Sequence, residues 1–308
     1  MSLERALELA ERGRGTTHPN PIVGAVVVRD DEVVGEGWHE RKGGPHAEVV
    51  ALDAAGERAR DATLYVSMEP CAHHGTTPPC TDAVLQAGVA KVVAGALDPN
   101  PEAQGGLDTL RAAGVEVELV DSFAARAQNE AWRTWVTKRR PFIVLKLALT
   151  LDGRVFVSGT ERWISGPDSR KRVHELRARM DAVAVGMGTA RADDPQLTAR
   201  DVGATRQPRR LVFGHGTAGN LEVRSGPLDA ELRALADEGV QSLLLEGGPT
   251  IARSFLDAGL VDKLMLFVAP HIAGAGLRFE PPHLRVSRMT AEPVGEDVLL
   301  TAYVHEPS

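Results

Sequence analysis

The sequence predicts an α/β protein of two domains, and three observations support this prediction. Strand-like and helix-like segments alternate along the first half of the chain, which is typical of layered α/β folds. The chain has 308 residues, more than one hydrophobic core usually contains. A basic cluster followed by proline, Lys138-Arg139-Arg140-Pro141, ends the last helical segment of that half. We therefore expect one domain at residues 1–140 and a second at residues 141–308.

The first domain should begin with a helix, because Ser2 can cap it and apolar residues recur along one face. Two strand-like segments flank an Arg-Asp-Asp-Glu turn and predict a hairpin. Strands and helices then alternate. In order, we expect helix 2–13, strands 22–28 and 33–38, helix 46–56, strand 63–67, a helix entered directly at Cys71, strand 89–94, helix 107–113, strand 115–120 and a helix from Ser122 to the basic cluster.

One histidine, one glutamate and two cysteines form the most informative motif of the chain. His46-Ala47-Glu48 is followed by Pro70-Cys71 and then by Cys80. An imidazole nitrogen and two thiolates can hold a tetrahedral Zn²⁺ and leave a fourth position for water, as in zinc-dependent nucleobase deaminases. The metal lowers the pKa of that water toward neutrality. Glu48 is too close to His46 in sequence to be another ligand, so we expect it to be the catalytic proton shuttle.

The cysteines also permit two other interpretations. The only two cysteines of the chain are Cys71 and Cys80, and their spacing permits a disulfide. The chain opens without an apolar signal segment, which predicts a cytoplasmic protein with reduced thiols and therefore a metal site. A closed structural zinc site would use His73 or His74 as fourth ligand. Glu48 argues against that site, because structural zinc needs no acid/base group beside it.

Composition narrows the class of partner. Hydrophobic residues make up 43% and charged residues 25% of the chain, which is ordinary for a globular protein. The longest apolar run, near residues 142–151, contains Lys146, so we expect no membrane span. The formal net charge of −7 gives no long-range attraction to a polynucleotide. A small-molecule substrate is therefore favoured over a nucleic acid.

In the second half, a strand at residues 142–149 is followed much later by a strand–turn–helix motif. Leu243-Leu244-Leu245 reads as a buried strand, and Glu246-Gly247-Gly248 precedes a helix over residues 251–258. Backbone N–H groups at such a helix start can bind a phosphate. A Gly-Gly pair in this position is also often only a tight turn.

Several segments together resemble a known family. They are residues 17–26, His46-Ala47-Glu48, residues 65–80, Asp98-Pro99-Asn100-Pro101 and Gln128-Asn129-Glu130. This set resembles the bifunctional deaminase–reductase of riboflavin biosynthesis. Eight residues separate the two cysteines, as in that family, whereas cytidine and tRNA-adenosine deaminases usually have two. Residues 146–154, Trp163-Ile164 and residues 185–198 are similar to the reductase domain of the family.

The resemblance implies a cytidine-deaminase-like α/β/α layer domain followed by a dihydrofolate-reductase-like α/β domain. It implies zinc-dependent hydrolysis of the 2-amino group of a diaminopyrimidinone ribosyl phosphate, followed by NADPH reduction of the ribosyl group to ribityl. We also expect a homo-oligomer, a dimer or a tetramer. Two alternatives remain open: a deaminase whose second half serves only assembly, and a zinc-binding module without activity.

The resemblance also implies roles for individual residues. Those expected to contact NADPH are Ala148, Trp163, Thr189, Asp193 and Gly248. Those expected to contact substrate are Asn20 and His39 in the deaminase, and Lys146, Asp152, Arg177, Leu197, Arg200 and Glu246 in the reductase. Simpler interpretations exist for several of them. Asn20 and Asp152 could be turn residues, His39 an exposed imidazole at a strand end, Trp163 a core residue and Arg177 part of a solvated helix face.

The chain departs from the family pattern at a few positions. Thr76 stands where the family usually has a cation suited to the substrate phosphate, and Arg41 or Lys42 could compensate. Glu161 stands where a serine usually contacts substrate. After Phe213 the usual turn is replaced by Gly214-His215-Gly216, and a strand present in relatives should be missing or shortened.

Overall fold

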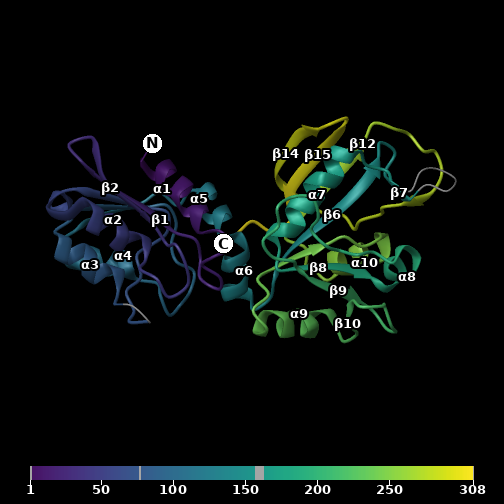
Figure 1. The fold of residues 1–308 in the computed structure, drawn as a ribbon, viewed down its shortest axis with the longest axis horizontal. Helices are drawn as coiled ribbons and strands as arrows, with labels where there is room; N and C mark the ends of the chain where they lie inside the picture. The colour runs from purple at the N-terminus through teal and green to yellow at the C-terminus, as the bar shows by residue number, and fades with distance from the viewer. Residues whose placement is uncertain (1, 76–77, 157–162, 308) are drawn as a thin grey trace. The chain divides into compact units, whose positions relative to one another are not determined.

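The computed structural model describes residues 2–75, 78–156 and 163–307. The chain divides into two compact units, Met1–Lys138 with the last two residues, and Arg139–Glu306 (Figure 1). Thr76 and Glu161, at which the sequence departs from the family pattern, lie outside the described residues. Among the helices of the described residues, none combines the length and apolar character needed to cross a bilayer.

The first unit contains a five-stranded sheet in the order β2-β1-β3-β4-β5. The hairpin predicted at its start is confirmed, because β1 pairs antiparallel with β2, and Asp30 and Asp31 between them have the positive φ angles that tight hairpins require. On its other side β1 pairs antiparallel with β3, whereas β3, β4 and β5 are parallel. The strands are β1 Gly24–Arg29, β2 Glu32–Trp38, β3 Thr63–Val66, β4 Lys91–Ala94 and β5 Glu116–Leu119.

Helices cover both faces of this sheet, as the predicted α/β/α layers require. Alternate strand residues point to opposite faces, so Val27 packs with Ala51, Val84 and other residues of one core, while Val26 packs with Leu9 in another. The helices are α1 Ser2–Ala10, α2 Ala47–Ala55, α3 Cys80–Ala87, α4 Gly106–Ala112, α5 Phe123–Gln128 and α6 Glu130–Lys138. A 3-10 turn, Glu11–Gly13, continues α1, and a second, Gly56–Ala59, continues α2.

Two helix predictions in this unit were wrong in detail. The helix expected directly at Cys71 begins only at Cys80. Two prolines precede Cys80, and a proline disfavours helical backbone at the residue before it. The single helix expected from Ser122 is two helices. Ser122 caps the first by accepting from the Ala125 N–H at 3.2 Å. The helix is interrupted at Asn129. Its side-chain oxygen accepts from the Ile22 N–H, and its side-chain NH₂ donates to the Ile22 carbonyl.

The second unit is built on an eight-stranded sheet in the order β10-β9-β8-β11-β6-β12-β15-β14. The six strands from β10 to β12 run parallel, β15 pairs antiparallel with β12, and β14 pairs antiparallel with β15. The strands are β6 Phe142–Thr150, β8 Ala182–Gly186, β9 Arg209–Phe213, β10 Glu222–Arg224, β11 Ser242–Leu245, β12 Lys263–Ala269, β14 Ser287–Val294 and β15 Asp297–Tyr303. A separate pair joins β7 Arg154–Phe156 to β13 Leu277–Arg278.

The helices of the second unit are α7 Pro167–Arg179, α8 Met187–Asp193, α9 Leu228–Asp237 and α10 Pro249–Asp257. Leu235 of α9 and Phe255 of α10 are fully buried in one core with Leu145 of β6 and Leu243 of β11. Between β9 and α9 the chain forms only the three-residue strand β10. The helix predicted after Gly248 is present as α10.

Candidate functional site

The three predicted zinc ligands lie together in the first unit. His46 is the N-cap of α2, Cys71 is on the loop after β3, and Cys80 is the first residue of α3. Each offers one ligand atom, and these atoms all lie within 4.8 Å of one another. The His46 Nδ1 atom is 3.1 Å from the Cys80 sulfur and 3.6 Å from the Cys71 sulfur.

This donor set fits zinc. A tetrahedral Zn²⁺ with bonds of about 2.0–2.3 Å places its ligand atoms roughly 3.5 Å apart. Both cysteines are free thiols, so the disulfide considered above does not form. His73 and His74 are exposed and are not part of the group, and among the described residues no fourth protein ligand joins it. The geometry therefore favours an open zinc site over a closed structural one.

Cys71 and Cys80 each shift the pKa of the other. The hydrogen bond from Cys80, supported by His46, lowers the pKa of Cys71, and the same bond raises the pKa of Cys80. A divalent cation between the sulfur atoms would stabilise both as thiolates. The close set of two sulfur atoms and one imidazole nitrogen therefore suits a divalent cation.

Glu48 lies in the first turn of α2, beside the ligand set. Its side chain is 3% exposed, and burial raises the pKa of its carboxyl to about 7. It interacts with Cys80 by a hydrogen bond, but it is not one of the clustered ligands. A buried carboxyl with a pKa near neutrality next to a metal site is suited to accepting and returning a proton.

His39 and Asn20 adjoin the same site. The His39 ring lies 5.4 Å from the His46 ring in an edge-on arrangement. His39 Nδ1 is 3.0 Å from the Pro45 carbonyl, which can only accept, so Nδ1 carries the proton. Its Nε2 atom then accepts from the Asn20 side-chain amide at 3.4 Å. Only 3% of His39 is exposed, so the interpretation as an exposed imidazole was wrong. Burial also lowers the pKa of His39, which keeps the ring neutral.

A partly buried charge cluster in the second unit brings together three of the residues predicted to contact substrate. Arg177 of α7 forms a bidentate pair with Glu246, at 2.6 and 2.9 Å, at the end of β11. Burial opposes ionisation of Glu246, but the pair with Arg177 lowers its pKa. Lys146 of β6 faces both groups, and burial lowers its pKa. Arg177 is therefore not part of a solvated helix face.

The segment at residues 197–200 packs against α7. Leu197 is buried and has a positive φ of 53°, and Arg200 is exposed. The Thr198 carbonyl accepts from Arg177 at 3.1 Å and contacts His174 Nδ1 at 3.0 Å. Sequence reasoning missed His174. Its spacing of three residues from Arg177, which places both on one helix face, is the signal that could have found it.

Two of the residues predicted to contact NADPH connect two helix starts. Because β8 and β11 are parallel neighbours, α8 and α10 both begin at the same edge of the sheet. The Gly248 N–H donates to Thr189 Oγ1 at 3.2 Å. At Gly247 a Cβ atom would come within 1.9 Å of the Ile251 side chain, so only glycine permits this close turn. Backbone N–H groups at two adjacent helix starts fit the phosphates of a dinucleotide.

The other predicted residues have diverse surroundings. Trp163 is 56% exposed with the Arg170 guanidinium 5.6 Å from its ring, so it is not a core residue. Ala148 lies on β6, and Asp193 ends α8. The carboxylate of Asp152 accepts from the Ala273 and Gly274 N–H groups, each at 2.9 Å. These contacts match those of an aspartate that ties a turn to a neighbouring loop.

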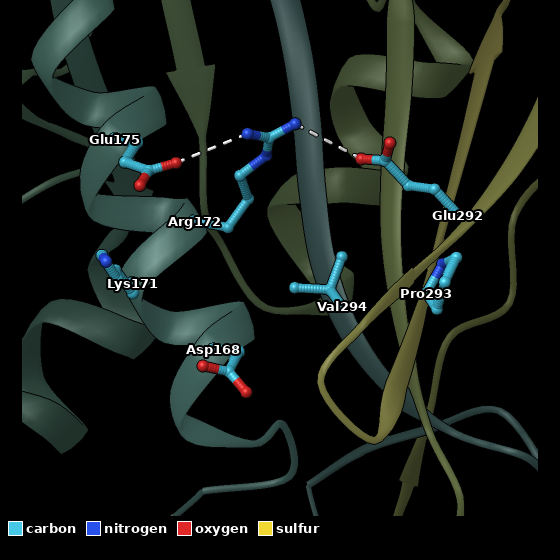
Figure 2. Close-up of a pocket in the computed structure, with 7 residues that line it drawn as sticks. All are labelled: Asp168, Lys171, Arg172, Glu175, Glu292, Pro293 and Val294. Atoms are coloured by element: carbon cyan, nitrogen blue, oxygen red, sulfur yellow. Dashed lines mark hydrogen bonds and ion pairs between the residues drawn. The ribbon is translucent and has the colours of Figure 1, made fainter.

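A hollow of about 300 Å³ opens between α7 and β14 (Figure 2). None of the predicted site residues lines it. Arg172 lies 3.4 Å from Glu175 of the same helix and 3.4 Å from Glu292 of β14, across the hollow. Arg172 is thus paired with a carboxylate on each side, and we assign the hollow no ligand.

Comparison with known proteins identifies the family. Residues 141–300 match the RibD C-terminal domain, and residues 2–96 match the cytidine and deoxycytidylate deaminase zinc-binding region. The chain is 41% identical to the riboflavin biosynthesis protein RibD of Aquifex aeolicus, over 97% of this chain and 96% of that protein. The chain belongs to the RibD family.

Other members of the family are also similar to this chain over most of its length. RibD of Escherichia coli is 41% identical, over 90% of this chain and 89% of that protein. The structure of Acinetobacter baumannii RibD aligns with a TM-score of 0.86 at 35% identity, over 98% of this chain and 97% of that one. A Thermotoga maritima structure described as a diaminohydroxyphosphoribosylaminopyrimidine deaminase/5-amino-6-(5-phosphoribosylamino)uracil reductase aligns with a TM-score of 0.83 at 36% identity, over 98% and 97% of the two chains. The similarity covers both units, which confirms the predicted pairing of a cytidine-deaminase-like fold with a RibD reductase fold.

Proposed function

We infer that this chain is a bifunctional enzyme of riboflavin biosynthesis that uses zinc and NADPH. The deaminase is assigned to residues 1–140 and the reductase to residues 141–308. The deaminase would hydrolyse the 2-amino group of a diaminopyrimidinone ribosyl phosphate, and the reductase would convert the ribosyl group to ribityl. The single observation that best supports this function is the open His46–Cys71–Cys80 set with buried Glu48 beside it, in a chain that has both halves of the family.

In the deaminase half, His46, Cys71 and Cys80 would hold the metal. Bound zinc supplies a nucleophile near neutral pH by lowering the pKa of a water in its open coordination position. Glu48 would take a proton from that water and deliver it to the departing amino group. Because the Asn20 amide nitrogen donates to His39, its carbonyl oxygen points away from that ring and can accept from an N–H of the pyrimidinone.

In the reductase half, Thr189, Gly248 and the α10 start would bind the cofactor phosphates, with Ala148, Trp163 and Asp193 as further contacts. NADPH supplies a hydride, which would go to C1′ of the ring-opened ribosyl group. Lys146 can deliver a proton to the ring oxygen as the sugar opens, because its lowered pKa makes the ammonium a stronger acid.

The remaining reductase residues would bind the substrate. The Arg177–Glu246 pair would fix the sugar hydroxyls, and Arg200 suits the phosphate because its exposed guanidinium has a forked donor geometry. Leu197 and Asp152 complete the proposed set. For Asp152 the contact to substrate would be indirect, through the 273–274 loop that its carboxylate holds.

The decisive experiment follows both reactions on the zinc-loaded full chain. Given the diaminopyrimidinone ribosyl phosphate and NADPH, the enzyme should release one ammonia and oxidise one NADPH per substrate. Ammonia release without NADPH oxidation would replace this proposal with a deaminase whose second half serves only assembly. If the chain bound zinc but catalysed neither reaction, it would be a zinc-binding module without activity.

We further propose a cytoplasmic site of action, supported by the two free thiols that the zinc site requires in reduced form. The oligomeric state stays a prediction, a dimer or a tetramer. Light scattering on the purified chain measures its mass directly.

A further inference from the structure

Cys71 differs from the other two zinc ligands in how the fold holds it. His46 and Cys80 are fixed at the starts of α2 and α3. Cys71 belongs to no helix or strand. On its C-terminal side it is tied to α3, because Thr81 N–H donates to the Cys71 carbonyl at 3.3 Å and Cys80 N–H approaches the Cys71 sulfur at 3.4 Å. Its N-terminal side needs another support.

Glu69 provides that support, two residues before Cys71. Its side chain is buried, and its carboxylate accepts three backbone N–H groups. One oxygen accepts from Gly105 at 3.1 Å and Leu107 at 3.0 Å, and the other accepts from Asp98 at 3.1 Å. The Glu69 N–H also donates to the Ala96 carbonyl at 2.9 Å. Glu69 thus binds the loop that connects β4 to α4.

The same carboxylate supplies the cap that α4 lacks. The N-cap of α4 is Gly105, which has no side chain to accept from the first turn. Glu69 accepts from the N–H groups of Gly105 and Leu107 instead, and a carboxylate is favoured at the positive end of a helix. The loop before Cys71 is therefore bound to the start of a helix that is distant in sequence.

Close packing fixes the intervening residue. At Gly106, a Cβ atom would lie 1.7 Å from the Pro70 carbonyl oxygen. Pro70 is thus pressed directly against the first residue of α4, with Glu69 on one side and Cys71 on the other. Because the φ of proline is restricted, a displacement at Glu69 passes to Cys71 with little freedom to absorb it.

We propose that Glu69 is a positioning residue for the zinc site, which holds Cys71 at the metal by binding the β4–α4 loop and capping α4. This proposal rests on the assignment of Cys71 as a zinc ligand. Residues that orient metal ligands typically alter metal affinity by about 10- to 100-fold when they are replaced.

Glu69→Gln in the full chain tests the proposal. Glutamine keeps the shape and can still accept from Gly105 and Leu107, but its NH₂ group would face the Asp98 N–H, donor against donor. We expect zinc affinity, measured by competition with a chromophoric chelator, to fall by roughly 10- to 100-fold. The visible absorption of the Co²⁺-substituted protein should also change, because that spectrum reports the tetrahedral geometry of the ligands.

Glu102→Gln is the matched control, because Glu102 is an exposed acid in the same loop. It should retain wild-type zinc affinity and cobalt spectrum. Wild-type values in Glu69→Gln, or an equal loss in Glu102→Gln, would overturn the proposal. Neither measurement needs substrate, so a wild-type protein that binds zinc but releases no ammonia contradicts the proposed function and not the role of Glu69.

A second variant acts on the same contact from the other side. Gly106→Ala leaves the Glu69 carboxylate intact and adds only the methyl group that meets Pro70. It should also weaken zinc binding and shift the cobalt spectrum. If Glu69→Gln does not fold, wild-type zinc affinity in Gly106→Ala is the result that overturns the proposal.

Discussion

At the scale of single residues, Glu48 is the group whose role the structure defines most sharply. It is buried beside the zinc ligands and yet is not one of them. Glu48→Gln keeps the shape and removes the basic oxygen, so zinc content should stay at wild-type level while ammonia release falls by at least ~10²-fold. Glu57→Gln, an exposed position just after α2, is the control and should leave both unchanged. An active, zinc-loaded Glu48→Gln enzyme would show that another group moves the proton.

Arg41 and Lys42 are two exposed cationic residues near the zinc site. They lie on the exposed loop between His39 and His46, which the His39–Pro45 contact closes beside the zinc site. Neither has an ion-pair partner within the part of the chain that the structure describes. With threonine at position 76, these two residues are our candidates for binding the substrate phosphate in the deaminase.

Replacing both residues tests that assignment. Hydrogen bonds to a charged group contribute about 1.5–3 kcal/mol, so Arg41→Gln with Lys42→Gln should raise the deaminase KM by about tenfold or more and change kcat little. Arg60→Gln, an exposed arginine on the same unit, should leave KM unchanged. Steady-state ammonia release over a range of substrate concentrations measures both constants. If KM were unchanged in the double variant, residues other than Arg41 and Lys42 would bind the substrate phosphate.

At the scale of elements, the starts of α8 and α10 are proposed to bind the cofactor. Gly248 is half-exposed, and a Cβ atom there would meet only Thr189 Oγ1, at 3.5 Å. Gly248→Asp should therefore be accommodated by the fold but should place a negative charge where a cofactor phosphate would bind. We expect the NADPH dissociation constant, measured by cofactor fluorescence, to rise at least ~10-fold, with ammonia release unchanged.

Ser254→Asp is the matched control for this prediction. It adds the same charge to the exposed side of α10, more than one turn beyond the helix start. NADPH binding in this variant should be close to that of wild type. If Gly248→Asp bound NADPH as tightly as wild type, the cofactor phosphates would not bind at this helix start.

The elements also show what the sequence could predict and what it could not. Short apolar segments predict the β1–β2 hairpin and the buried strands β6 and β11, because burial on one or both faces leaves a local pattern. The break between α5 and α6 has no such local signal. It depends on the Asn129 amide finding the backbone of Ile22, which is 107 residues away in sequence.

The candidate sites also contain residues whose role the sequence predicts and residues whose role it does not. The spacing of His46, Cys71 and Cys80 is specific enough to predict the zinc ligands from sequence alone. The support of those ligands cannot be predicted in this way, because Glu69 accepts from backbone N–H groups, which every residue type except proline provides. Asp152 presents the same difficulty, since its partners at residues 273 and 274 are again backbone groups.

At the scale of the whole molecule, the two proposed sites use residues of different units. All three zinc ligands and Glu48 belong to Met1–Lys138, while Lys146, Arg177, Glu246 and the α10 start belong to Arg139–Glu306. Each unit also has its own hydrophobic core. Loss of the metal should therefore abolish one reaction and spare the other.

Zinc removal tests this independence directly. After dialysis against a chelator, or in Cys80→Ala, ammonia release should fall to background, because the ligand set is broken. NADPH oxidation with the deaminated intermediate as substrate should stay within about twofold of wild type, a change of less than ~0.5 kcal/mol in the barrier. Adding Zn²⁺ back should restore ammonia release to the dialysed wild type but not to Cys80→Ala. A parallel loss of NADPH oxidation on chelation would mean that the reductase depends on the metal or on the fold of the first unit, and the two sites would then have to be treated as coupled.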